Sequence, residues 1–298
     1  MRLSQIEVNE LTKNWGITIP TVANYNWILA AKGQYVYCQG ASEGSIQKRA
    51  RADGSLIWEK DFNVSDLSRE ILVDSQQNLY TSSGGNVYKY DNDGDILWTK
   101  DVIEGSTNDV ILQHISSAED EILVTGFVGG SNRVFILSAS TGEILLTIAD
   151  KCANTRRSSK FLSSGDIVGF STLSPYYRIK RWARSDGSII WTSTSSFEIT
   201  ATITIDADDN IWAIRYSSPN YYISKISKST GNELLATFIG TLRSSFHFYS
   251  SDNSIVLGIY NDSTDVLTIN KYDVDTGVLL ATQDFSNITA YNNAVITK

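Results

Sequence analysis

Proline and cysteine are almost missing from this sequence, with three and two copies among 298 residues. So few prolines exclude long proline-rich linkers between domains. The two cysteines, Cys38 and Cys152, lie far apart along the chain. They provide neither a disulfide framework nor the clustered thiolates of a structural zinc site. A hydrophobic core therefore has to stabilise the fold, and the hydrophobic content of 42% is ample for one.

Long apolar runs are missing as well. No stretch approaches the roughly 20 apolar residues that a membrane helix needs, and residues 1–7 contain no apolar core of a secretory signal. We therefore expect no membrane insertion, and a chain that is cytoplasmic or assembled into a particle. The formal net charge of −8 disfavours bulk attraction to nucleic acid or to anionic membranes, so that no nucleic-acid partner is expected.

Strand-forming residues and glycine turns, by contrast, are abundant. The sequence has 7 Trp, 15 Tyr and 10 Phe, and aromatic and β-branched side chains favour β-sheets. A turn centred on glycine and followed by an apolar strand recurs at a period of about 44 residues, which indicates an internal repeat. Such a turn needs a residue that tolerates positive φ. The glycines of these turns are Gly54, Gly94, Gly142, Gly187, Gly231 and Gly277.

A second hairpin alternates with the glycine turn, and in it a polar turn joins two apolar strands. Residues 71–80 and 203–212 are examples. Each period thus holds four strands, a and b in this hairpin and c and d around the glycine. We name the connections by the strands that they join: ab, bc and cd turns within a repeat and da loops between repeats. Four strands in about 44 residues predict the blade of a β-propeller.

The two hairpins occur in unequal numbers: the sequence has seven ab hairpins but only six glycine hairpins. The N-terminal segment aligns with a cd hairpin and places Trp15 where other repeats have Trp58, Trp98 and Trp191. We therefore predict an all-β fold in which residues 1–298 form a single seven-bladed β-propeller with four antiparallel strands per blade. In the composite seventh blade, N-terminal strands c and d (about residues 4–19) pair with C-terminal strands a and b (about 286–298), which would leave no open end.

The cd hairpin resembles the pyrroloquinoline-quinone-type (PQQ-like) repeat. Its marks here are Ser-Ala-Ser-Thr-Gly at 138–142 and Gly-x-x-x-Trp at 54–58, 94–98 and 187–191. The ab turns are similar to those of NHL-type propellers, and the four-strand period is WD40-like. The resemblance implies a propeller whose tryptophans pack between blades. Quinoprotein dehydrogenases have eight blades, a vicinal cysteine pair and a calcium site, which this sequence does not match, so no cofactor is expected.

Catalytic and metal-binding patterns are scarce. The two histidines, His114 and His247, fall in a strands that would line the central channel, and a zinc site usually needs three or four ligands. The acidic segments 91–95 and 206–210 are better explained as turns than as calcium loops. No Gly-x-Ser-x-Gly elbow occurs, although a triad can assemble across space. We expect no metal and no enzymatic activity; the alternative is a channel-mouth enzyme acting on sugars through paired carboxylates.

Aromatic bc turns in two adjacent repeats suggest a binding surface, because tyrosine is enriched at interfaces. With the neighbouring da loop they would form a bc/da face for a protein or glycan partner. The alternative is that these tyrosines only cover the ends of the blades. A basic segment at 151–184 is either part of this face or a solvated surface. A second functional hypothesis is a structural component of a larger assembly, such as a phage virion or tail, with homo- or hetero-oligomeric packing. The candidate binding residues are Tyr176, Tyr177, Tyr221, Tyr222, Tyr260, Arg156 and Arg157.

Overall fold

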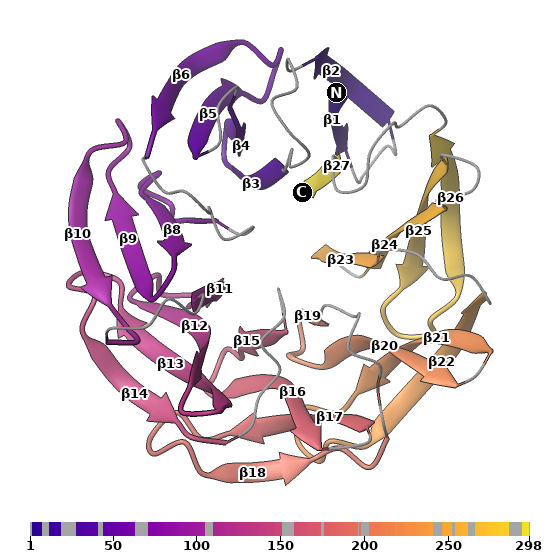
Figure 1. Ribbon diagram of the computed structural model, residues 1–298. Helices are drawn as coiled ribbons and strands as arrows, with labels where there is room; N and C mark the ends of the chain where they lie inside the picture. The colour runs from indigo at the N-terminus through magenta and orange to yellow at the C-terminus, as the bar shows by residue number, and fades with distance from the viewer. Residues whose placement is uncertain are drawn as a thin grey trace.

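The computed structural model is a ring of β-sheets arranged radially around a common axis (Figure 1). In the part of the chain that the structure describes, all 27 elements are β-strands, which confirms an all-β propeller. In the described part of the chain, no helix is long and apolar enough to cross a membrane. The structure describes residues 2–7, 12–18, 28–40, 44–62, 71–104, 110–150, 158–173, 176–195, 197, 203–217, 219–240, 246–251, 254–261, 266–285 and 294–297.

Six sheets have four strands each, paired in the order a, b, c, d from the axis outwards, and we number them as blades 1–6. Blade 1 contains β3 (Ile28–Lys32), β4 (Tyr35–Gln39), β5 (Ser45–Ala50) and β6 (Leu56–Asp61). Blade 2 contains β7 (Leu72–Val73), β8 (Leu79–Ser83), β9 (Asn86–Tyr90) and β10 (Ile96–Asp101). Blade 3 contains β11 (Val110–Ile115), β12 (Glu121–Val128), β13 (Ser131–Ser138) and β14 (Ile144–Ile148).

The second half of the ring repeats this pattern, and all pairs within blades 1–6 are antiparallel. Blade 4 contains β15 (Ser159–Phe161), β16 (Ile167–Leu173), β17 (Tyr176–Trp182) and β18 (Ile189–Thr192). Blade 5 contains β19 (Ile203–Ile205), β20 (Ile211–Ser217), β21 (Asn220–Ile226) and β22 (Glu233–Gly240). Blade 6 contains β23 (Phe246–Ser251), β24 (Ser254–Asn261), β25 (Val266–Asp273) and β26 (Leu279–Phe285).

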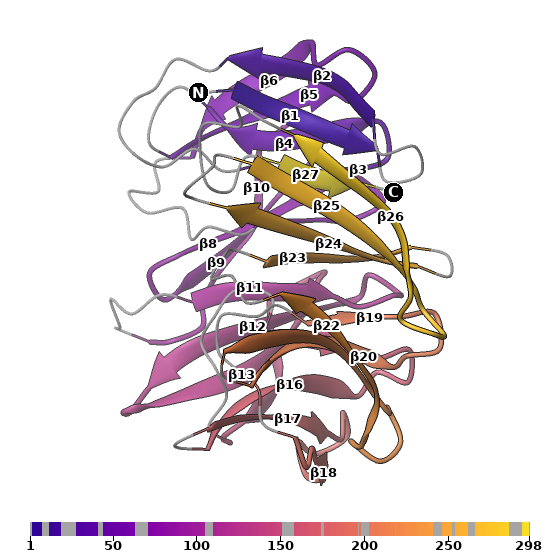
Figure 2. The same cartoon turned by 90° about the vertical axis from the view of Figure 1, so that its right-hand side faces the viewer.

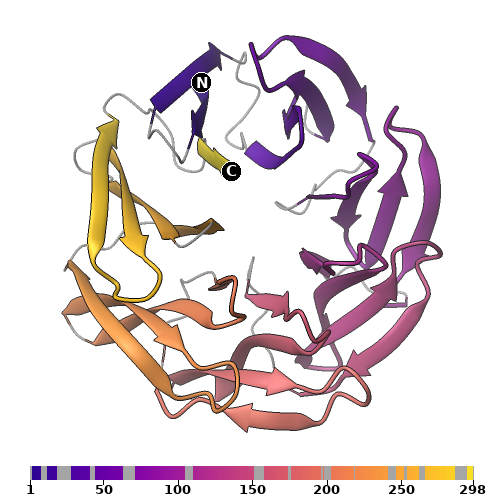
Figure 3. The same cartoon turned by 180° about the vertical axis from the view of Figure 1, so that it is seen from behind.

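The prediction of seven four-stranded blades is wrong, because the structure has six. Between blades 6 and 1 lies a three-stranded sheet of β1 (Arg2–Glu7), β2 (Thr12–Thr18) and β27 (Ala294–Thr297). The N-terminal hairpin does pair with the C-terminal strand, but β1 and β27 run parallel and not antiparallel. Residues 286–293, where an innermost strand was expected, lie outside the described part. Figures 2 and 3 show both ends of the chain at this sheet.

Apolar side chains between the blades form the core. One cluster joins blades 4, 5 and 6 through residues such as Phe170, Trp212 and Leu257, each fully buried. A second cluster joins blades 2 and 3 through Tyr80, Leu112 and Val124. Because each sheet buries both faces against neighbours, consecutive residues of a middle strand can both be apolar, as in the Ile-Leu-Val run of β12 and the Ile-Val-Leu run of β24.

The six glycines of the cd turns all have positive φ, between 67° and 83°, as predicted. At four of them a Cβ atom would also lie closer than 3.0 Å to a side chain of the neighbouring blade, and at two of these four that side chain is a tryptophan. A Cβ atom on Gly142 would lie 2.9 Å from the Trp98 ring, and one on Gly231 would lie 2.5 Å from the Trp191 ring. Each of these tryptophans therefore packs on the turn of the next blade.

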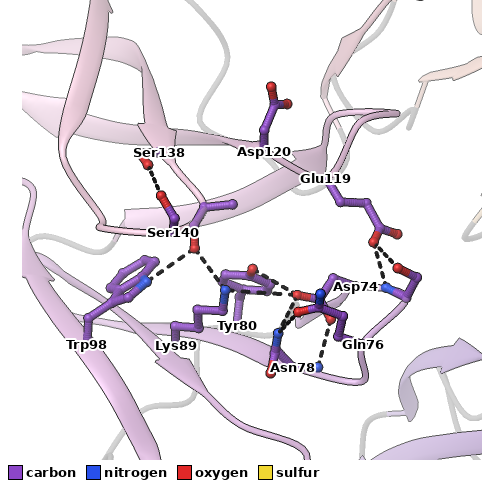
Figure 4. Close-up of polar contacts among 12 residues, drawn as sticks. Asp74, Gln76, Asn78, Tyr80, Lys89, Trp98, Glu119, Asp120, Ser138 and Ser140 are labelled. Carbon is purple, nitrogen blue, oxygen red and sulfur yellow. Dashed lines mark hydrogen bonds and ion pairs between the residues drawn. The ribbon is translucent and has the colours of Figure 1, made fainter.

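The same tryptophans donate hydrogen bonds across the blade boundary. The indole Nε1 of Trp58 donates to the carbonyl oxygen of Asn92 at 3.2 Å, that of Trp98 to Ala139 at 3.2 Å (Figure 4), and that of Trp191 to Lys228 at 2.8 Å. The expected packing of these side chains between blades is thus confirmed. Trp15 lies in β2, opposite Gln5 of β1, but its side chain lies outside the described part.

A cation on strand c bonds to the same carbonyl groups. Nζ of Lys89 lies 3.0 Å from the carbonyl oxygen of Ala139, which Trp98 also contacts, and a guanidinium nitrogen of Arg181 lies 2.8 Å from that of Lys228. In blade 5, where Leu235 replaces the tryptophan, Lys225 still donates to Val274 at 2.8 Å. Blades 1, 2, 4 and 5 are therefore each coupled to the next through the backbone of a cd turn.

Candidate functional site at the channel mouth

The ab turns carry unusual backbone conformations at one rim of the ring. Gln77, Glu119 and Asp209 have φ of 67°, 58° and 66°, which is strained for residues other than glycine. They occupy the same position of the ab turn in blades 2, 3 and 5, where blades 1 and 4 have Gly33 and Gly165. A conformation that costs free energy at three equivalent positions has to be held by surrounding contacts.

Each of these three side chains accepts a hydrogen bond from the preceding blade. Gln77 accepts from the Tyr37 hydroxyl at 3.1 Å. Glu119 accepts from the backbone N–H of Ser75 at 2.7 Å and from the Ser75 hydroxyl at 2.5 Å. Asp209 accepts from both the backbone N–H and the hydroxyl of Ser163. The turns are thus joined from blade to blade around part of the rim, which stabilises the positive φ angles.

Within this rim lies a cavity of about 490 Å³ at the mouth of the central channel. Its walls come from the ab turns and a strands of blades 1, 3, 4 and 5. Charged, hydroxyl and apolar groups alternate along them. The polar lining residues are Lys32, His114, Ser116, Ser117, Glu119, Lys160, Ser163, Thr204 and Asp209.

Lys32 and Glu119 form an ion pair of 2.8 Å across the cavity wall. Partial burial of Glu119 acts to raise its pKa, but hydrogen bonds from Lys32 and Ser75 outweigh that effect and lower the pKa below its ordinary value. The carboxylate is therefore ionised at neutral pH. It is suited to fixing the turns and is poorly suited to acting as a general acid.

His114 lies on β11 and lines the cavity, as expected for a strand a residue. Its Nδ1 accepts the backbone N–H of Phe161 at 3.2 Å. Burial, assisted by the nearby Lys160 cation, lowers the pKa of His114 well below its ordinary value. The imidazole is thus neutral, with its proton on Nε2. His247 lies in β23, with its side chain outside the described part.

A second set of charged residues lies behind the ab turn of blade 2 (Figure 4). The buried Asp74 carboxylate accepts from Asn78 at 2.8 Å and from the Tyr80 hydroxyl at 3.1 Å, and Lys89 lies 4.0 Å away. Blade 5 repeats the arrangement, because Asp206 accepts from Trp212 at 3.0 Å and pairs with Lys225 at 3.3 Å. These buried ion pairs connect ab turns to strand c and serve the fold.

The acidic turns are explained by their own backbone. Oδ1 of Asp91 accepts the N–H groups of Asp93 and Asp95, and Oδ1 of Asp206 accepts those of Asp208 and Asn210. These bonds are the Asx turns expected from the sequence. Among the residues that the structure describes, no group of three or more His, Cys, Asp and Glu side chains could hold a metal ion.

The candidate tyrosines do not share one environment. Tyr221 is only 6% exposed and packs in the core, so that it offers little surface to a partner. Tyr222 is half-buried, and Tyr177, also half-buried, packs against the core cluster of blades 4–6. Tyr176 and Tyr260 lie in β17 and β24 with side chains outside the described part, and Arg156 and Arg157 fall outside it entirely.

An aromatic surface that the sequence did not reveal lies beside Tyr222. Phe238 is 55% exposed and packs edge-to-face on Tyr222, with ring centroids 5.9 Å apart. The Arg215 guanidinium lies 4.7 Å from the centroid of the same Tyr222 ring. The three residues are paired in register on strands b, c and d of blade 5, near the bc turn. The cluster is identified by the strand register, which pairs Tyr222 with Arg215 on one side and Phe238 on the other. The periodicity of the sequence does not reveal this register.

Much of the basic segment is used inside the fold. Lys180 pairs with Asp150 at 2.6 Å, Arg181 with Asp166 at 2.5 Å, and Arg184 with Glu121. Arg178 donates to the carbonyl oxygen of Ser193 at 2.8 Å. These four cations therefore stabilise blade 4 and its contact with blade 3. Lys160 lies in the cavity wall.

Comparison with known proteins identifies the family to which this propeller belongs. The PQQ-type repeat family described as outer membrane protein assembly factor BamB matches residues 8–174. The chain belongs to this family. The BamB family match confirms the PQQ-like repeat that the glycine and tryptophan spacing indicated. No curated protein is similar enough in sequence to count as a match.

Several solved propellers share the fold. BamB from Moraxella catarrhalis is 14% identical, with a TM-score of 0.54 over 93% of this chain and 81% of that one. A streptogramin B lyase is 14% identical, with a TM-score of 0.65 over 90% and 84%. A propeller solved as a complex of KlAtg21 with the coiled-coil of AgAtg16 is 10% identical, with a TM-score of 0.67 over 93% and 91%. At these identities the likeness concerns the fold alone.

Proposed function

We propose that this BamB-family propeller is a non-enzymatic scaffold that binds a protein partner through its bc/da face. The observation that carries the proposal is the cluster of Arg215, Tyr222 and Phe238. An exposed aromatic ring, held by a second ring and an arginine, matches the composition of protein-binding hot spots. Phe127, near the bc turn of blade 3, adds a second aromatic side chain, 40% exposed, at the same face.

Rigidity makes such a face effective. Tyr222 is fixed between Arg215 and Phe238 by the register of β20, β21 and β22. A side chain that is already ordered loses little entropy when a partner covers it. The complex of KlAtg21 with a coiled-coil offers an example of a protein with this fold bound to a protein segment. A protein partner is therefore preferred here to a glycan.

The chemistry of the channel mouth supports a non-enzymatic role. Glu119 and Asp209, the carboxylates in its wall, are both engaged by serine donors of the preceding blade. The Nδ1 lone pair of His114 is occupied by the N–H of Phe161. A general acid or base needs a group that can exchange a proton with the substrate. These groups instead hold the turns and strands that form the cavity.

The test places a photo-crosslinking amino acid at position 238 in cells that express the full chain. We expect one discrete adduct with another protein. The matched control carries the same amino acid at Ala118, which is exposed in the ab turn of blade 3, at the opposite face of the ring. Adducts that are equal at both positions, or none at position 238, would contradict the proposal. A Tyr222→Ala, Phe238→Ala variant that stays folded should lose the partner identified in this way.

A further inference from the structure

The outer strands of all six blades expose apolar side chains at one place. The second residue of strand d, next to the cd turn, is between 46% and 58% exposed in every blade. Single exposed apolar residues are ordinary, but in five blades the first residue of strand d is apolar and exposed as well, so that neighbouring exposed residues form a patch on each of these strands. The residues at the second position are Ile57, Leu97, Leu145, Ile190, Leu234 and Leu280.

A β-bulge lies at each of these residues. In blade 2, Ile96 pairs with Tyr90 and Trp98 pairs with Lys89, so that Leu97 has no partner on strand c. The register shifts in the same way in the other five four-stranded blades. In blades 1, 2 and 4 the residue after the bulge is the tryptophan that packs on the next blade, and the apolar side chains on its N-terminal side stay at the surface.

The outer strands of blades 1 to 5 each lie against the cd turn of the following blade, and most of these turns carry carboxylates. Lys60 packs on Gly94 and pairs with Asp95 at 2.9 Å, and Ile148 packs on Gly187. The neighbouring turns of blades 2, 3, 4 and 6 carry exposed acids. Between blades 4 and 5 the turn instead has Ser229, Thr230 and Asn232. The exposed acids are Asp93, Glu143, Asp186 and Asp275.

We propose that this surface, the cd rim, is a docking site for a basic amphipathic helix of another protein. The cd rim comprises the six bulged apolar residues and the four exposed acids named above. The apolar side of the helix would lie on the bulged residues, and its Lys and Arg side chains would meet the carboxylates. It lies near the cd turns, away from the bc/da face, and therefore constitutes a second interaction surface.

The same features argue against other occupants. A bulged edge strand does not accept an added β-strand, because its hydrogen-bonding groups are out of register. A second copy of the chain would bring two acidic rims together, with a net charge of −8 on each molecule. An anionic lipid surface would be repelled by the same carboxylates. A helix that is both apolar and basic satisfies both parts of the rim.

The probe for the test is a fluorescent synthetic helix of leucine and lysine, about 18 residues long, with leucine at i, i+3, i+4 and i+7. Binding to the full-length protein is measured by anisotropy. We expect Leu145→Ser to weaken binding about 10-fold, which is about 1.4 kcal/mol. The matched control is Ile190→Ser, at the equivalent bulge that faces no acid, and it should change the affinity less than Leu145→Ser does.

The electrostatic part has its own control. Glu143→Lys with Asp186→Lys should weaken binding about 10-fold, or about 1.4 kcal/mol. Asp101→Lys with Glu104→Lys changes the net charge equally at the opposite end of an outer strand and should have little effect. If both double variants lost the same affinity for the helix, the binding would depend on net charge alone, and the proposal would be overturned. So would tighter binding to phosphatidylcholine vesicles than to the helix, or a dimer that Leu145→Ser dissociates.

Discussion

Ser163, in the ab turn of blade 4, donates its backbone N–H and its hydroxyl to the same carboxylate, that of Asp209 in blade 5. Asp209 in turn has a φ of 66°, so that a strained backbone and an inter-blade bond occur in one residue. The pair Ser75 and Glu119 repeats the arrangement between blades 2 and 3. The carboxylates that join the ab turns at the rim of the channel mouth therefore belong to residues whose own backbone is strained.

The first prediction concerns the serine hydroxyl. Ser163→Ala should lower the free energy of unfolding by about 1 kcal/mol, because a hydrogen bond to a charged acceptor is lost. Ser117 is the matched control: it occupies the same turn position in blade 3, but the opposing residue in blade 4 is Gly165, which has no side chain. Urea denaturation measures both. Equal effects of the two substitutions would show that the bond to Asp209 contributes nothing.

The second prediction concerns the contact between glycine and tryptophan. Gly231→Ala should destabilise the fold by about 2–4 kcal/mol, because it adds a clash with Trp191 to the cost of a positive φ. Gly129→Ala is the control, since Gly129 also has a positive φ but faces open space. It should cost only about 1 kcal/mol. The urea midpoints of the two variants separate packing from backbone strain.

The third prediction concerns pH. The pKa of Glu119 is lower in the folded protein than its ordinary value. The unfolded state therefore binds a proton more tightly, and the stability due to Glu119 is complete above its unfolded pKa and lost as the pH falls through the folded pKa. Glu119→Gln should flatten the decline of the urea midpoint between pH 5 and pH 3. Glu143→Gln, at an exposed turn position, serves as the comparison; an identical decline in the Glu119 variant and the unmodified protein would contradict this.

The fourth prediction concerns ring closure. Deleting residues 2–18 removes β1 and β2, the outer two strands of the three-stranded sheet between blades 6 and 1. Exposed edges would follow at two sheets, and we expect a loss of more than about 3 kcal/mol. A synthetic peptide of residues 1–18 should restore part of the melting temperature. If the truncated chain melts at the same temperature as the full chain, the three-stranded sheet does not close the ring.

The sequence predicted those parts of the fold that depend on local chemistry. Gly142 and Gly231 revealed the cd turns because only glycine fits both the φ angle and the tryptophan contact. The bulge at Leu97 was not predicted, since a one-residue register shift leaves the spacing of apolar residues unchanged. The prediction of a seventh regular blade was wrong because hairpin counting assumed antiparallel pairing between the two ends of the chain, whereas β27 joins β1 in parallel.

The candidate site was predicted less well, and the tyrosines show why. Consecutive residues of a strand point to opposite faces of the sheet. Tyr221 and Tyr222 in β21 therefore could not both reach a partner, and Tyr221 is the one that packs in the core. Phe238 became a candidate only once the register placed it opposite Tyr222. The channel-mouth cavity, in the same way, depends on ab turns brought together from separate blades.

The hydrogen bonds that the tryptophans donate to the cd turns all run in one direction. Trp58, Trp98 and Trp191 each donate forward, from one blade to the next along the chain, and none of these bonds depends on where the chain begins. A circular permutant, with its old ends linked and new ends opened in another da loop, would keep every one of them. The tryptophan bonds thus give the ring a direction, from each blade to the next. They do not require the chain ends to lie in any particular blade.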